Sequence, residues 1–132
     1  MKQHFCKQIG IALLLCILTG KDSQNNGTVF HDYFAISMDG DTILMEEYKN
    51  RKILLVNVAS KCGYTPQYKE LQQLHKYHGN ELIVLGFPSN NFLWQEPGNN
   101  KEIKTFCQRK YGVSFQLFEK IHVKGKNQHS IF

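Results

Sequence analysis

Cys62 is the residue whose type and surroundings best suit chemistry in this sequence of 132 residues. A nearly continuous apolar run, residues 53–59, precedes it, and a helical pattern begins at Pro66. A thiol between a buried strand and the start of a helix lies near the positive end of the helix dipole, which favours the nucleophilic thiolate. The neighbouring Lys61 adds positive charge. We therefore predict a reactive thiol at Cys62, and the alternative is a cysteine that merely packs.

The positions of the other three cysteines limit which disulfides and metal sites the chain can form. Cys6 and Cys16 fall in the first twenty residues, so removal of that segment leaves Cys62 and Cys107. Two cysteines in an exported chain also suit a structural disulfide, and that alternative stays open here. There is no Cys-x-x-Cys pair and no Cys/His set at zinc spacing, so we predict no metal site.

The N-terminal segment is typical of a secretory signal peptide. Lys2 and Lys7 precede an apolar run at residues 9–18, and small residues follow at Thr19 and Gly20. The run is shorter than the ~20 apolar residues that a membrane-spanning helix needs. We predict a signal peptide over residues 1–20 and export of the protein, either secreted or periplasmic. A retained N-terminal anchor is the alternative, so a membrane association would arise only through this segment.

The remainder predicts one α/β domain over residues 29–132, after a polar linker at 21–28. Strands at residues 33–38 and 42–44 flank the turn residues Asp39, Gly40 and Asp41, which indicates a β-hairpin. The apolar runs 53–59 and 82–87 are typical of parallel strands buried on both faces. The other expected elements are a helix from Pro66 to Gly79, a long loop at 89–100, a helix at 101–111 and a short strand at 121–123.

The charge distribution argues against one class of partner. The net charge is +5, but no run of five or more Lys and Arg occurs. We therefore predict no nucleic-acid site. His75, His78, His122 and His129 are scattered without metal-ligand spacing and are interpreted as surface or boundary residues.

Three ordered blocks resemble the glutathione peroxidase family. Residues 56–68, Val-Asn-Val-Ala-Ser-Lys-Cys-Gly-Tyr-Thr-Pro-Gln-Tyr, are similar to its peroxidatic signature. Residues 85–92 with 95–98 are similar to a second signature, and residues 106–115 to a third block. The resemblance extends from about Thr28 to Phe132. It implies a thioredoxin-like fold and reduction of hydrogen peroxide and organic hydroperoxides in the response to oxidative stress.

The same resemblance implies roles for three residues. Cys62 takes the peroxidatic position, and Gln95 takes that of the active-site glutamine, whose amide assists the thiolate or the departing oxygen. Cys107 takes the position of the resolving cysteine in two-cysteine members, where it forms a disulfide with the oxidised Cys62. Its alternative role is a small core residue on the apolar face of a helix. No bound cofactor is implied, since glutathione or a thioredoxin-like protein acts as reducing co-substrate.

The sequence also departs from the family pattern. Ser89 replaces a cysteine, and Leu93 and Trp94 stand directly before Gln95. The family continues with a Trp-Asn-Phe segment, a hairpin and a final helix that the printed sequence does not contain. We therefore expect a domain that is incomplete at its C-terminus, without the ββα part of the fold. A non-catalytic redox sensor, or a truncated remnant without peroxidase turnover, is the alternative function.

Overall fold

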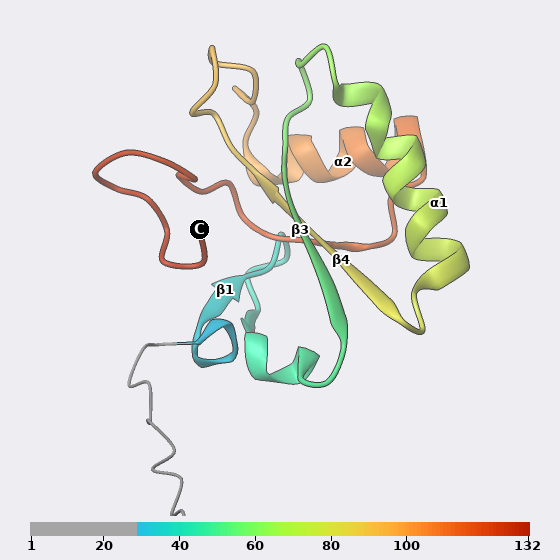
Figure 1. The fold of residues 1–132 in the computed structure, drawn as a ribbon. Coiled ribbons are helices and arrows are strands. Elements are labelled where there is room, and N and C mark those ends of the chain that lie inside the picture. The colour runs from blue at the N-terminus through green and yellow to red at the C-terminus, as the bar shows by residue number, and fades with distance from the viewer. Residues whose placement is uncertain (1–28) are drawn as a thin grey trace, which may run out of the picture.

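The computed structural model describes residues 29–132, and the predicted signal peptide and linker lie outside them. The backbone follows an α/β course with a small hairpin before the main sheet (Figure 1). Its strands are β1 (Phe34–Ile36), β2 (Thr42–Leu44), β3 (Lys52–Val58), β4 (Leu82–Pro88) and β5 (Gln116–Leu117). Its helices are α1 (Tyr68–His78) and α2 (Asn100–Tyr111), with 3-10 turns η1 (Phe30–Asp32), η2 (Met45–Tyr48) and η3 (Thr65–Gln67). No helix within residues 29–132 has the length and apolar content needed to span a membrane.

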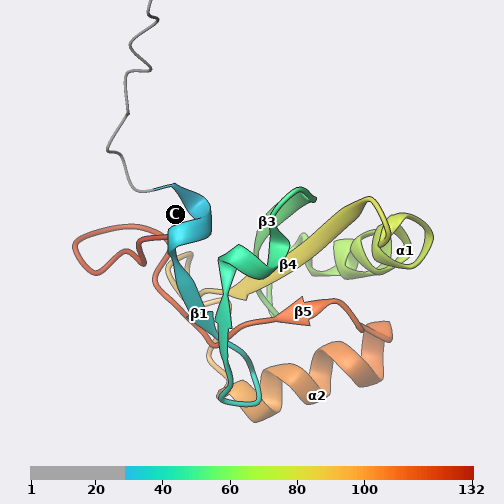
Figure 2. The ribbon, with the colours of Figure 1, turned by 90° about the horizontal axis from the view of Figure 1, so that it is seen from below.

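The main sheet has the strand order β3-β4-β5, and both of its pairings are parallel. β3 and β4 pair along their whole length, from Lys52 opposite Leu82 to Val58 opposite Pro88. β5 lies on the far side of β4 from β3 (Figure 2). The predicted hairpin is confirmed, because β1 and β2 pair antiparallel across the turn at residues 37–41. α1 connects β3 to β4, as parallel pairing requires.

Side chains on the two faces of the main sheet enter separate apolar clusters. On one face, strand residues such as Val58 and Val84 pack with residues of α1 and α2. On the other face, Leu85 and Phe87 pack with the hairpin and η2. Figure 1 shows α1 and α2 on one side of β3 and β4, and β1 on the other. The alternation follows from the period of two residues along a strand.

Local signals explain where the helices begin and end. The Asn99 side chain accepts the Glu102 N–H at 2.9 Å, and the Glu102 carboxylate accepts the Asn99 N–H at 2.9 Å, which is a capping box at the start of α2. Gly112 ends α2 with a left-handed φ of 63°. Gly79 ends α1 where the sequence predicted, but with a right-handed φ of −58°. A Cβ there would stand 2.5 Å from the His75 carbonyl oxygen, so contact with the preceding turn requires the glycine.

Two predictions about strands were wrong. Residues 121–123 form no strand, and the third strand of the sheet is β5, a few residues earlier. The edge of β4 at Leu85 and Gly86 pairs with Gln116 and Leu117, so tertiary pairing overrides the β-branched composition of 121–123. β3 is also not buried on both faces, since most of its residues are only half-buried. It lies at an edge of the described sheet, where β4 alone pairs with it.

A substitution at Gly86 tests the close packing between β4 and the side chains of Leu117 and Phe115. A Cβ at this position would meet the Leu117 Cδ2 atom at 2.6 Å and the Phe115 Cε2 atom at 3.0 Å. We expect Gly86→Ala to lower the free energy of unfolding by about 1–3 kcal/mol, because the cluster beside it has no room for another methyl group. Urea denaturation measures the change. Gly63→Ala is the matched control, since nothing lies within 4 Å of its Cβ position, and equal losses in both variants would contradict the packing argument.

Candidate active site

The site lies at the carboxyl ends of β3 and β4, where two loops leave the sheet side by side. Residues 59–64 with η3 follow β3 and carry Cys62, and residues 89–99 follow β4 and carry Gln95. The Ser89 N–H donates to the Val58 carbonyl at 3.0 Å, which extends the strand pairing by one step. The Lys61 N–H donates to the Gln95 carbonyl at 3.0 Å and joins the loops directly. The structure thus brings together Cys62 and Gln95, which are distant in sequence.

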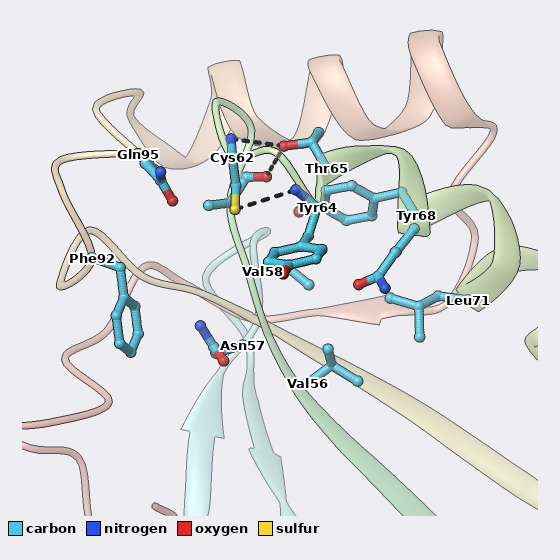
Figure 3. A pocket seen from close by; sticks show the side chains of 12 residues that line it. Val56, Asn57, Val58, Cys62, Tyr64, Thr65, Tyr68, Leu71, Phe92 and Gln95 are labelled. Carbon is cyan, nitrogen blue, oxygen red and sulfur yellow. Dashed lines mark hydrogen bonds between the residues drawn. The ribbon is translucent and has the colours of Figure 1, made fainter.

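Thr65 closes the loop that holds Cys62. Its hydroxyl oxygen accepts the Cys62 N–H at 2.9 Å and donates to the Ala59 carbonyl at 2.8 Å. The Thr65 N–H in turn donates to the Cys62 carbonyl at 3.0 Å. The Tyr64 N–H points at the Cys62 sulfur, with N and Sγ 3.4 Å apart (Figure 3). The loop thus presents one backbone hydrogen-bond donor to the sulfur, where it can stabilise negative charge that develops during a reaction.

Cys62 is half-buried and opens into a cleft of about 480 Å³. The walls are mainly apolar and come from β3, from α1 and from both loops. Besides Cys62 and Gln95, the residues lining it include Val56, Val58, Tyr64, Leu71 and Phe92. In Figure 3 the Gln95 side chain and the Cys62 sulfur lie at the same end of this cleft. A small molecule in the cleft therefore meets one sulfur nucleophile and one amide.

The backbone before Gln95 is strained. Leu93 and Trp94 have φ values of 50° and 57°, a left-handed conformation that non-glycine residues rarely adopt. They sit within a turn that the Gln95 N–H closes by donating to the Phe92 carbonyl at 3.1 Å. Their side chains are 85% and 81% exposed, whereas Gln95 lines the cleft. The two residues that depart from the family pattern thus project outward and leave the amide at the site.

Cys107 lies in a different environment from Cys62. It is fully buried on α2, within the cluster beneath the cleft, next to Tyr68 of α1. Burial raises the pKa of the Cys107 thiol to about 11. Both cysteines are free thiols in this structure. Tyr68 lines the cleft and also packs with Cys107, so this ring lies between the cleft and the second thiol.

Glu96, directly after Gln95, is a carboxyl group that is 0% exposed. The Ser60 hydroxyl donates to its Oε1 atom at 2.5 Å, and its own N–H donates to the Asn90 side-chain oxygen at 2.8 Å. Its second oxygen, Oε2, is buried without a hydrogen-bond partner. Burial raises the pKa of the Glu96 carboxyl, against the hydrogen bonds from Ser60 and the charges of Lys120 and Lys61, which lower it.

The sequence did not predict roles for Ser60, Thr65 or Glu96. Thr65 lies three residues after Cys62, a spacing that suits a bond from its side chain to the backbone of the loop. This contact could therefore have been predicted from the sequence. The contact between Ser60 and Glu96 spans 36 residues and leaves no such signal. Among residues 29–132, no group of three or more His, Cys, Asp and Glu side chains is arranged to hold a metal ion.

The sequence profile of the glutathione peroxidase family matches residues 30–132. The glutathione peroxidase homolog BsaA of Halalkalibacterium halodurans is 50% identical over 103 residues, which are 77% of this chain and 66% of that protein. The thioredoxin/glutathione peroxidase BtuE of Escherichia coli is 46% identical over 96 residues, 72% of this chain and 52% of that protein. The crystal structure of Trgpx in apo form superposes with a TM-score of 0.57 at 31% identity, covering 80% of this chain and 61% of that chain.

The chain belongs to the glutathione peroxidase family. Its α/β fold is thioredoxin-like, as the sequence predicted. The chain spans about two thirds of the length of BsaA and about half of that of BtuE.

The two thiols differ in accessibility, and alkylation tests this difference. At pH 7 we expect iodoacetamide to modify Cys62 well before Cys107, because burial shields Cys107 and keeps it protonated. The raised pKa alone slows Cys107 by about tenfold or more relative to an unperturbed thiol. Peptide mass spectrometry at timed intervals distinguishes the sites. In urea both cysteines should react at similar rates, and equal rates in the folded protein would contradict this description of the site.

Proposed function

We propose that this protein is a thiol-dependent peroxidase that reduces hydrogen peroxide and organic hydroperoxides in the response to oxidative stress. The observation that carries the proposal is the placement of Cys62. Its sulfur receives a backbone N–H and opens into a cleft that Gln95 also lines. The names of the relatives, glutathione peroxidase homolog and thioredoxin/glutathione peroxidase, support the same reaction.

The proposed first step is a two-electron transfer at Cys62. The thiolate sulfur attacks one peroxide oxygen, the O–O bond breaks, and the other oxygen leaves and takes up a proton to become an alcohol or water. Cys62 is left as a sulfenic acid. The Gln95 amide is positioned at the same end of the cleft to hydrogen-bond the thiolate or the oxygen on which charge develops. Such a fixed donor stabilises the transition state without the reorganisation that water would need.

The proposed second step uses Cys107 as the resolving thiol. Its sulfur attacks the Cys62 sulfur, a disulfide forms, and the sulfenic oxygen leaves as water. Cys107 is fully buried on an ordered helix, so we propose that local unwinding of α2 brings its sulfur to Cys62 in the geometry that a disulfide requires. A thioredoxin-like dithiol or two molecules of glutathione then reduce the disulfide. We favour the thioredoxin-like reductant because two-cysteine chemistry produces an intramolecular disulfide. The name of BtuE, thioredoxin/glutathione peroxidase, includes both reductants.

Treatment of the full chain with one equivalent of hydrogen peroxide tests the cycle. We expect mass spectrometry to show a mass loss of two hydrogens and a peptide pair that links Cys62 to Cys107. Gln95→Ala should slow peroxide consumption by about a hundredfold, the order of effect of removing one fixed donor to developing charge. A Cys62 that stops at sulfinic acid with Cys107 free would remove the resolving role. Consumption of peroxide at an unchanged rate in Cys62→Ser would remove the proposed function.

We also propose that residues 1–20 direct export, to the periplasm or to the outside of the cell. The support is the basic flank, the short apolar run and the small residues at the end of this segment. N-terminal sequencing of the protein purified from its native host should give a chain that begins near Lys21. A mature chain that begins at Met1 would contradict cleavage and favour the retained anchor.

A further inference from the structure

A buried polar contact connects the two loops of the site, beside both candidate catalytic residues. Ser60 lies two residues before Cys62, and Glu96 follows Gln95 directly. The Ser60 hydroxyl donates to the fully buried Glu96 carboxyl at 2.5 Å. The neighbouring backbone bond, from the Lys61 N–H to the Gln95 carbonyl at 3.0 Å, runs between the same two loops. These two hydrogen bonds form a clamp that joins Ser60 and Lys61, before Cys62, to Gln95 and Glu96.

Packing alone does not account for a carboxyl group at this place. An apolar side chain of similar size would avoid the cost of burying polar oxygens, and the Oε2 atom of Glu96 has no partner to offset that cost. Unpaired buried polar groups in native proteins are rare and often mark functional sites. Lys61 and Lys120 are the cations that act on the carboxyl, and the ionisable Tyr68 and Cys107 face it from α1 and α2.

The clamp holds a strained stretch of backbone in place. The turn before Gln95 contains two consecutive residues in the left-handed region, Leu93 and Trp94, and such conformations persist only where surrounding contacts hold them. Glu96 is held on the far side of Gln95 by three contacts, from Ser60 to its carboxyl, from its N–H to Asn90, and from the Lys120 ammonium group to its carbonyl at 3.3 Å. Release of the carboxyl would free the strained turn to move the Gln95 amide away from the sulfur.

We propose that Glu96 is a positioning residue whose buried hydrogen bond with Ser60 holds the Gln95 amide at the end of the cleft where the Cys62 sulfur lies. The inference rests on the proposed roles of Cys62 and Gln95. It adds a residue that acts through Gln95 and touches neither substrate nor sulfur. Its consequence is that the reactivity of Cys62 depends on a contact outside the cleft.

Alkylation of Cys62 in the full chain tests the proposal without peroxide turnover. Ser60→Ala and Glu96→Leu remove the donor and the acceptor, and each should slow alkylation of the folded protein about fivefold, the rate change that corresponds to one typical hydrogen bond. Ser60→Thr and Glu96→Gln retain a donor and an acceptor, and each should stay within about twofold of the wild type. If Glu96→Leu does not fold, Ser60→Ala alone still tests the contribution of this hydrogen bond.

A double substitution shows whether the effect passes through Gln95. Gln95→Ala should slow alkylation of Cys62 by itself, and adding Ser60→Ala to it should slow the reaction no further. Leu85→Val, which removes a buried methylene from the cluster on the opposite face of the sheet, is the control for destabilisation alone and should leave the rate unchanged.

Two results would overturn the proposal. One is an alkylation rate that is unchanged in Ser60→Ala and Glu96→Leu although their stability falls, which would make Glu96 a structural residue only. The other is a fivefold effect of Ser60→Ala that persists without the Gln95 side chain. Alkylation needs no peroxide, so the two proposals can fail separately. If the variants show the expected alkylation rates but the protein does not reduce peroxide, the positioning role of Glu96 holds and the proposed function is contradicted.

Discussion

The parallel pairing of β3 with β4 is the constraint on which the site depends. The two strands run in register from Lys52 opposite Leu82 to Val58 opposite Pro88, so they end level with each other. The chain leaves both strands at the same edge of the sheet, and Cys62 and Gln95 lie in the two loops that begin there. A slip of one residue would turn every side chain of β3 to the other face and remove the support beneath Cys62.

The layer beneath the cleft combines packing with polar groups that reduce its stability. The Tyr68 hydroxyl and the Glu96 Oε2 atom are both buried without hydrogen-bond partners, and the Cys107 thiol lies in the same region. The two free thiols lie in different environments. The Cys62 sulfur accepts a backbone N–H beside the cleft, whereas burial raises the pKa of Cys107 and keeps that thiol protonated. The proposed two-thiol cycle includes an opening of α2, a helix that Asn99 caps at its start and Gly112 at its end.

Much of this arrangement could be predicted from local sequence. The apolar runs at 53–59 and 82–87 gave two strands correctly, and turn residues at 39–41 gave the hairpin, because these signals depend on neighbours in the chain. The position of Cys62 after a strand also followed from local pattern. The expected strand at 121–123 was wrong because strand pairing along β4 involves Gln116 and Leu117, and the Ile121 N–H makes only a single backbone bond to that edge, to the Pro88 carbonyl at 3.0 Å. The contact of Ser60 with Glu96 was out of reach for a similar reason, since it exists only after the two loops have been brought together.

In the proposed reaction the Cys62 sulfur takes one oxygen from the peroxide. The direct measurement is a single-turnover reaction of the Cys107→Ser protein with one equivalent of cumene hydroperoxide and dimedone, followed by peptide mass spectrometry. We expect cumyl alcohol to form in an amount equal to the protein and dimedone, which traps sulfenic acid, to be attached to Cys62. Peroxide that persists, or dimedone found on Cys6 or Cys16 with Cys62 unmodified, would contradict it.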